Sequence, residues 1–474
     1  MWGRGRVWGW GSTGWRRRSE MDDYLVMADA DRVQEYVFTP HELRLIRGGS
    51  ALQTELNREF LPALVMGPGQ RTISKNGGTV LAAFPSLAEA ETFCAGARSR
   101  FRQKTQIATI STALTEYPAG RFEQARSEVQ RLLEMKKQER AGSRFIGGGP
   151  LWAVCPACGL YPSAGFSSAK RSIAYCEACR RRERASDRRR LLPGGAKPAE
   201  DLGSIGRAAR PENYIAFLYI DLDRMGEWLP KHAGNDEEKF TKLSETVFQT
   251  VTDATKGACQ GMVKDGMATH EIFLIGGDDV ALAIPADRCF AFLAKFRELY
   301  EKQDKLPPFS VGMTIAHSHF PIAEFRRISQ ELLRSAKAIK GSHSIDYEIV
   351  TNSMVERVAA TRGERAAQDG RFRTRKPYSL DEFADLERAV RELKQAAPAS
   401  KVRSLYLIAH RELMQAELDY LTLLGRVDKE ARGELLKTIG QGLFQADGTG
   451  KESTKAADLA ELWEFVRNGT EAGN

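Results

Sequence analysis

The chain has 474 residues, of which 42% are hydrophobic and 28% are charged. This composition is typical of a globular protein of roughly two to four domains, and it excludes a fibrous or largely disordered chain. The longest apolar runs, such as residues 214–220, are too short to cross a bilayer, so we expect no membrane contact. No secretory signal is visible at the basic N-terminus, and we expect a cytoplasmic location.

The net charge indicates the kind of partner, and the cysteine content indicates the cellular compartment. The formal net charge is +8, which favours a polyanionic partner such as a nucleic acid or a nucleotide. The seven cysteines are an odd number, and four of them form a metal-binding pattern. This usage indicates a reducing compartment rather than a disulfide framework.

Residues 1–20 have neither a helix nor a strand period, although they contain four of the seven tryptophans. We expect them to be disordered or to precede a true start at Met21. The alternative is a basic, aromatic arm that binds nucleic acid.

The rest of the chain contains an internal repeat. "DADRVQEYV" from Asp29 aligns with "DLDRMGEWL" from Asp221, and "NGGTVLAAFP" from Asn76 aligns with "IGGDDVALAIP" from Ile275. An internal repeat indicates two copies of one structural unit, so we interpret it before any single motif. In both copies, strands alternate with helices around a hairpin, so the fold class is α+β. We predict two ferredoxin-like domains, residues 21–145 and 213–355, each a mixed sheet with helices on one face.

The segment between the two copies, residues 146–192, carries a zinc-ribbon pattern. Its cysteines are spaced C-x2-C, then 17 residues, then C-x2-C, at Cys155, Cys158, Cys176 and Cys179. Four thiolates close a tetrahedral Zn²⁺ site with no open position, so we expect a structural metal.

A run of seven arginines falls within residues 180–190, and Arg180, Arg181, Arg182 and Arg184 are expected on a helix. A solvated face and a surface for RNA or a protein partner explain this run equally well. Residues 193–212 read as a linking loop. Residues 356–474 are predicted to form a small helical bundle.

The second copy places four carboxylates close together. Asp221 and Asp223 lie on one face at the end of an apolar strand, and the hairpin tip brings Asp278 and Asp279 to the neighbouring strand end. Crowded carboxylates repel one another, and a bound Mg²⁺ or Mn²⁺ would compensate their negative charge. These ions can activate a ribose hydroxyl and stabilise a leaving pyrophosphate. The alternative is an exposed Gly-Gly-Asp-Asp turn without a catalytic role.

Three further residues complete the predicted nucleotide site. Gly276 and Gly277 allow the turn and the close approach of a phosphate to the backbone. Lys337 lies in a helix that follows the hairpin, and its ammonium could bind a triphosphate. An ordinary surface lysine is the alternative for Lys337.

Taken in order, these motifs resemble the large, polymerase-like subunit of type III CRISPR effector complexes. The resemblance covers nearly all of residues 22–474 and rests on "DADRVQEYVF", "IRGGSALQTELN", the four cysteines, "YIDLDRMGEWL", "LIGGDDVALAIP" and "ELLRSAKAIKG". It implies two palm domains, a zinc ribbon between them and a helical C-terminal domain. It also implies an enzyme that polymerises ATP into cyclic oligoadenylate, a messenger of antiviral defence. Guide RNA, target RNA and other effector subunits would be its partners.

The resemblance also assigns roles to residues. Asp221, Asp278 and Asp279 would bind metal, Asp223 would support them and Lys337 would hold triphosphate. The first palm has Gly77-Gly78-Thr79-Val80 where the second has GGDD, so it would be inactive yet would hold a second ATP. Gly48, Gly49 and Ser50 could approach phosphate there, although a tight helix-start turn explains "RGGS" equally well.

Many relatives begin with an HD nuclease domain. No His-Asp dipeptide occurs in this sequence, so we expect none here. Two other functions remain open: another palm-domain synthase that makes a cyclic dinucleotide, and a catalytically silent scaffold subunit. The motifs do not specify the base, the ring size or the activating signal.

Overall fold

The computed structural model describes residues 23–139, 153–168, 172–186, 196–351, 358, 361–364, 370–446 and 450–467. Residues 1–20 and the last three arginines of the basic run, Arg188 to Arg190, lie outside these ranges, as does the predicted start at Met21. Within the described ranges, no helix has the length and apolarity that a membrane span needs.

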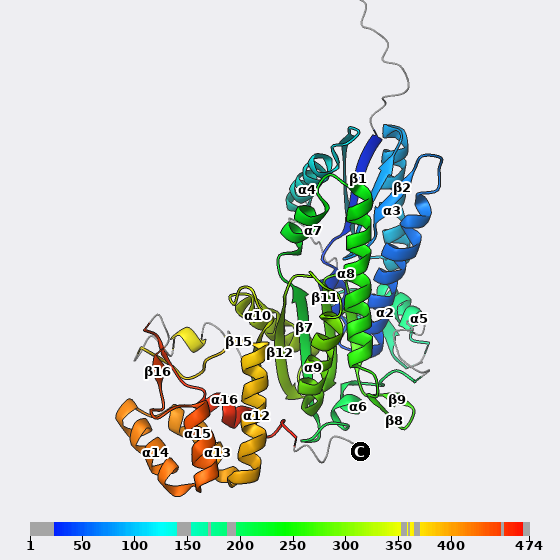
Figure 1. Cartoon of the computed structure of the whole chain (residues 1–474). Helices are drawn as coiled ribbons and strands as arrows, with labels where there is room; N and C mark the ends of the chain where they lie inside the picture. The colour runs from blue at the N-terminus through cyan, green and yellow to red at the C-terminus, as the bar shows by residue number, and fades with distance from the viewer. Residues whose placement is uncertain are drawn as a thin grey trace, which may run out of the picture.

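The first copy of the repeat is built on a four-stranded sheet with the order β2-β3-β1-β4. Figure 1 shows its strands β1 and β2 in blue. The central strand β1 pairs antiparallel with both β3 and β4. The strands are β1 (Asp23–Ala30), β2 (Arg71–Ser74), β3 (Thr79–Phe84) and β4 (Ile110–Tyr117). The helices are α1 (Val33–Phe38), α2 (Leu43–Glu55), α3 (Leu87–Thr105) and α4 (Phe122–Glu139), with short turns η2 (Leu56–Phe60) and η3 (Pro62–Leu64) after α2.

The second copy is built on a six-stranded sheet with the order β10-β11-β7-β12-β13-β15. Its strands are β7 (Tyr214–Leu222), β10 (Glu271–Ile275), β11 (Asp279–Pro285), β12 (Phe309–His317), β13 (Ser344–Val350) and β15 (Tyr378–Ser379). Its helices are α7 (Met225–Ala233), α8 (Glu237–Ala258), α9 (Cys289–Tyr300) and α10 (Ile322–Ala336), with the turn η7 (Ala286–Arg288) before α9. The predicted repeat of α+β domains is confirmed.

The second sheet is covered on both faces, so the expectation of helices on one face is wrong. Leu218 and Ile220 of β7 pack in one core with α8 and α9. Phe217 packs in another core, against Phe38 of the first copy and Phe325 of α10. A strand that is buried on both faces needs apolar residues at successive positions, and the run "YIAFLYI" has this property.

Contacts at both ends of the interface join the copies to each other. Arg47 of α2 and Glu271 of β10 form a buried ion pair with a separation of 2.5 Å between Nη2 and Oε2. At the other end, Phe240 of α8 packs edge-on against Phe122 of α4, with ring centroids 5.3 Å apart. Because a buried charge without its partner is strongly destabilising, the Arg47–Glu271 pair fixes how α2 lies against β10.

The cysteine-rich module packs on the first copy. It consists of the two-stranded sheet β5 (Gly165–Phe166) and β6 (Ala174–Tyr175), followed by α5 (Glu177–Ala185). Arg182 of α5 is fully buried, and its guanidinium lies 4.2 Å from the ring centroid of Tyr36. The predicted linking loop at 193–212 contains a short helix, α6 (Leu202–Gly206), with a capping box at Asp201.

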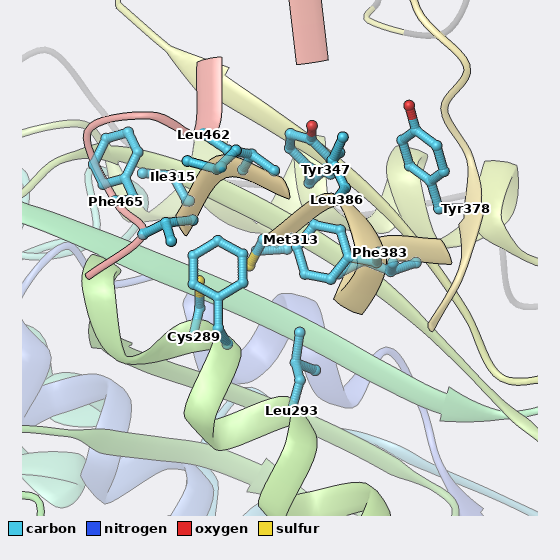
Figure 2. Packing of buried hydrophobic residues seen from close by; sticks show 14 of the residues in the cluster. Cys289, Leu293, Met313, Ile315, Tyr347, Tyr378, Phe383, Leu386, Leu462 and Phe465 are labelled. Atoms are coloured by element: carbon cyan, nitrogen blue, oxygen red, sulfur yellow. The ribbon is translucent and has the colours of Figure 1, made fainter. Parts of the chain in front are cut away.

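The C-terminal region shares a core with the second copy. Figure 2 shows Phe383 and Leu386 of α12 beside Met313 of β12 and Leu293 of α9. The helices are α12 (Leu380–Ala396), α13 (Ala399–Ala409), α14 (Leu413–Arg426), α15 (Lys429–Thr438) and α16 (Ala456–Leu462). A small sheet, β14 (Arg371–Phe372), β17 (Glu452–Ser453) and β16 (Gln445–Ala446), accompanies them, and β15 extends the second palm sheet. The predicted helical domain is therefore present, and it is joined to the palm through β15 and the shared core.

Candidate active site

The predicted carboxylates gather at one edge of the second sheet. Asp221 lies near the end of β7, and Asp279 opens the antiparallel strand β11 directly opposite it. Asp278 precedes Asp279 in the hairpin turn, and its carbonyl oxygen accepts a hydrogen bond of 3.1 Å from the Leu222 amide. Gly277 has a φ of 116°, which favours glycine in this turn.

The electrostatics of this edge disfavour three ionised carboxylates. Burial, followed by the charge of Asp221, raises the pKa of Asp278 to about 6. Burial and the charges of Asp278 and Asp221 raise the pKa of Asp279 to about 7. Burial also raises the pKa of Asp221, although Lys337 opposes this shift. A divalent cation would relieve the cost of ionising all three.

Lys337 lies at this edge of the sheet, and its ammonium group contacts a carboxylate. The residue is the C-cap of α10, and its Nζ donates to Oδ2 of Asp221. Asp223 lies nearby and accepts a hydrogen bond of 2.8 Å from the Ser310 hydroxyl.

The three carboxylates do not converge on one point. Among the described residues, the four cysteines are the one group of three or more potential ligands whose atoms lie within 4.8 Å of one another. The Asp279 carboxylate instead accepts a hydrogen bond of 3.0 Å from the Tyr219 hydroxyl. In this arrangement Lys337 contacts Oδ2 of Asp221, and Tyr219 contacts Oδ2 of Asp279.

Tyr219 connects Asp279 to the first copy, and the sequence reasoning missed it. Gln34 of α1 donates to the Tyr219 hydroxyl, and Gln330 of α10 donates to Gln34. Strand alternation could have found Tyr219, because residues two apart on a strand share a face and Asp221 follows it by two.

A cavity of about 510 Å³ lies between the two copies, next to Asp279. Its lining combines glycine turns, amides and cations, among them Gln34, Asn57, Arg58, Lys75, Asn76, Gly77, Gly78, Gly276, Asp279 and Arg326. The two hairpins face each other here, since a Cβ on Gly77 would lie 2.9 Å from the carbonyl oxygen of Gly276. Only glycine allows this approach of the two turns.

The strand register corrects the alignment of the two hairpins. Thr79 pairs with Asp29 as Asp279 pairs with Asp221, so Gly78 occupies the position of Asp278. The predicted match of Gly77-Gly78-Thr79-Val80 with GGDD is therefore wrong by one residue. The first copy still lacks both hairpin carboxylates.

The degenerate site keeps one feature of the intact one. Lys137 of α4 forms an ion pair with Asp29, as Lys337 of α10 does with Asp221. Thr79 also donates a hydrogen bond of 2.5 Å to Asp29. Comparing the helix ends of the two repeats, "EMKKQ" and "RSAKA", could have revealed Lys137 from the sequence.

Gly48, Gly49 and Ser50 do not form a helix-start turn. They lie in the middle of α2 and are buried. A Cβ on Gly48 would overlap the carbonyl of Arg182, so this glycine allows α5 to pack closely on α2. These residues are not part of the lining of the cavity between the copies, and a role for them in nucleotide binding stays a prediction.

The predicted metal pattern in the ribbon is confirmed as a cluster. Cys155, Cys158, Cys176 and Cys179 are all buried, and their sulfur atoms lie within 4.8 Å of one another. The side chain of Cys176 also caps α5 by accepting from the Cys179 amide at 3.4 Å. The basic run beside it is not a uniformly solvated face. Arg182 is buried, whereas Arg180, Arg181 and Arg184 bind Glu177.

Comparison with known proteins agrees with this geometry. Residues 214–345 match the family model of Cas10/Cmr2, second palm domain. The chain is similar to Cas10. The resemblance inferred from the sequence is thus confirmed, and Asp221, Asp278 and Asp279 fall within the matched range. No curated protein sequence matches the chain.

Solved structures of Csm1 share the fold. A Csm1–Csm4 cassette in complex with one ATP is 15% identical with a TM-score of 0.62, and the match covers 95% of this chain and 71% of that chain. A Csm1–Csm4 cassette in complex with cA3 is 15% identical with a TM-score of 0.61, covering 95% and 70%. Csm1 from T. onnurineus is 15% identical with a TM-score of 0.62, covering 94% and 69%.

Proposed function

We propose that the chain is a nucleotidyltransferase that converts ATP into a cyclic oligoadenylate messenger of antiviral defence. The observation that carries this proposal is the pairing of Asp221 with Asp279, beside Asp278, where Asp279 lines a cavity closed by the first palm. The similar Csm1–Csm4 structures with ATP and with cA3 support adenine nucleotides as substrate and product.

The donor set suits Mg²⁺ or Mn²⁺. Burial and neighbouring carboxylates raise the pKa values of Asp278 and Asp279, so ionising both has a cost that a bound cation would offset. Carboxylate oxygens are the ligands these ions prefer. Asp221, Asp278 and Asp279 would bind the metal ions. When bound, the ions would activate a ribose hydroxyl and neutralise the leaving pyrophosphate.

The chain's own residues position the nucleotide. The facing turns at Gly77 and Gly276 allow phosphate oxygens to approach backbone amides. Arg58 and Arg326 supply positive charge to the cavity from opposite copies. Lys337 would exchange Asp221 for a triphosphate oxygen when the nucleotide and metal arrive. Tyr219, hydrogen-bonded to Gln34, would hold one oxygen of Asp279 in place.

We assign Zn²⁺ to the four buried cysteines as a structural ion. Four thiolates leave no position for substrate, and the module is too small to bury a core without a metal. Guide RNA, target RNA and other effector subunits are the proposed partners, and a cytoplasmic setting fits them. The similar Csm1 chains assembled with Csm4 support partner subunits.

A specific observation favours a second candidate, a catalytically silent scaffold. Lys337 neutralises Asp221 as Lys137 neutralises Asp29 in the degenerate copy. A palm fixed in this arrangement would bind no catalytic metal. Turnover therefore discriminates between the two candidates.

The test is an assay of purified chain with each labelled NTP and Mg²⁺ or Mn²⁺, alone and with copurifying RNA plus a complementary target. A cyclic adenylate product should form and should disappear in the Asp278→Ala/Asp279→Ala variant. Asp253→Ala, on the exposed face of α8, is the matched control and should keep full activity. A cyclic dinucleotide would indicate the other synthase. Silence under every condition from a folded protein would favour the scaffold.

A further inference from the structure

A second large cavity, of about 940 Å³, lies at the far end of the second palm from Asp279. It is bounded by the end of α8, the hairpin of β8 (Val263–Lys264) and β9 (Met267–Ala268), and the start of α9. Pro285, at the opposite end of β11 from Asp279, lines it. A strand rises about 3.3 Å per residue, so roughly 20 Å separates this cavity from the catalytic edge. Figure 1 shows β8 and β9 below α9, away from the first copy.

Five cations line this cavity, and they come from four segments of the chain. We call it the basic cleft, defined by Arg210, Lys264, Arg288, Lys295 and Arg467. Its lining includes no aspartate or glutamate among the described residues. Cations gathered from distant segments without interspersed carboxylates create a local positive potential that attracts an anion.

Behind the cleft, Asp287 fixes part of this arrangement. Its side chain is fully buried, and one oxygen accepts a hydrogen bond of 3.0 Å from the Arg210 amide. Its other oxygen binds Arg467 and lies 3.9 Å from Nε of Arg288. One carboxylate thus orients two guanidinium groups without neutralising the cleft. Nε of Arg467 is buried and has no hydrogen-bond partner within the described part of the chain.

The rim leaves the other cations available. Lys264 is exposed and forms no ion pair within the described ranges, and Lys295 binds only its helix neighbour Glu298, at 2.8 Å. Apolar Met262 and Val263 lie on the same rim, and Val263 is 40% exposed. Phosphates can contact the cations while riboses or bases cover these apolar side chains.

We propose that the basic cleft binds the phosphate backbone of single-stranded RNA. Three of the five cations are arginines, whose forked donors match phosphate oxygens. This binding site is separate from the ATP cavity, and it does not depend on the proposed synthase activity.

The test measures binding of fluorescein-labelled U20 RNA to the full chain by anisotropy at several NaCl concentrations. Lys264→Glu/Lys295→Glu should weaken binding by about tenfold or more, and the slope of log K against log salt should fall by about 1.4, or 0.7 for each lost phosphate contact. Lys239→Glu/Lys242→Glu changes the charge equally at the exposed, opposite end of α8. This control should change the affinity by less than about twofold.

Two further arms separate the alternatives. Asp278→Ala/Asp279→Ala should bind RNA as the unaltered chain does, because the cleft lies apart from the catalytic edge. Equal losses in both lysine variants, or no loss in the cleft variant, would overturn the proposal. A labelled oligoglutamate peptide is the probe for an acidic protein segment. If the cleft variant loses the peptide but keeps the RNA, the site is a protein-docking surface and the RNA proposal is wrong.

Discussion

Lys337 donates to a carboxylate oxygen of Asp221, so the proposed triphosphate ligand and a proposed metal ligand neutralise each other in the free protein. Lys137 and Asp29 repeat this pair in the first palm, which lacks the hairpin carboxylates. An ammonium group and a divalent cation compete for the same carboxylate. The ion pair therefore sets the affinity of the free site for metal.

Replacing Lys337 with methionine should separate its two roles. Without the competing ammonium, Mn²⁺ affinity in the absence of nucleotide should rise about tenfold, as measured by the loss of the free Mn²⁺ signal in electron paramagnetic resonance. The KM for ATP should rise as well, because the triphosphate loses a cation. Lys302→Met, at an exposed position after α9, is the control and should change neither quantity. Unchanged Mn²⁺ affinity would show that the pair does not compete with metal.

The close approach of the turns at Gly77 and Gly276 predicts that a side chain at Gly77 reduces turnover. Gly77→Ala should abolish most turnover, because its Cβ would lie 2.9 Å from the Gly276 carbonyl oxygen and push the two palms apart. Gly120 also has a positive φ, 73°, but a Cβ there would meet nothing within 4 Å. Both alanine variants should lose about 1–2 kcal/mol of stability from left-handed strain. Only Gly77→Ala should lose activity, and equal activity in the two variants would contradict the importance of the contact.

The raised pKa of Asp279 predicts how stability depends on pH. Because this pKa lies at about 7 in the folded chain against 3.8 ordinarily, the folded state binds a proton more tightly than the unfolded state does. The ionised carboxylate therefore costs stability above about pH 7, and the cost declines as pH falls from 7 towards 3.8.

Without divalent metal, Asp279→Asn should increase the free energy of unfolding by on the order of 2 kcal/mol at about pH 8. The gain should shrink steadily by about pH 4.5, as measured by urea denaturation at each pH. Added Mg²⁺ should stabilise the unaltered chain more than the variant. Asp253→Asn, on an exposed helix face, should show no such pH dependence. A gain that is constant across this pH range would rule out ionisation as its cause.

Loss of the zinc site should lower the stability of the chain by weakening the packing of α5 on the first copy. Cys176→Ser should remove about one equivalent of zinc, as measured by mass spectrometry of the metal, and should lower the Tm by several degrees. The reason is that Cys176 caps the N-terminus of α5, and Arg182 of this helix packs against Tyr36 and Gly48. Cys259→Ser, at a buried cysteine outside the cluster, should keep the zinc. Full zinc content in Cys176→Ser would contradict the four-cysteine site.

Much of the fold and part of the site follow from local pattern. The repeat, the hairpin and the C-x2-C spacing depend on residues that are near each other in the chain. They predicted two α+β domains, the strand-end placement of Asp221 and Asp279, and the clustering of the four cysteines. Strand periodicity suffices for these, because alternation fixes which side chains share a face.

Tertiary structure alone decided the remainder. The sequence allowed "RGGS" to be a phosphate turn, but contact with Arg182 buries it inside α2. The register of β1 against β3, rather than the glycine pair, aligned Thr79 with Asp279. The Lys337–Asp221 ion pair and the basic cleft each bring together residues that are distant in the chain. Only packing brings these residues together, because no helix or strand period relates their positions in the sequence.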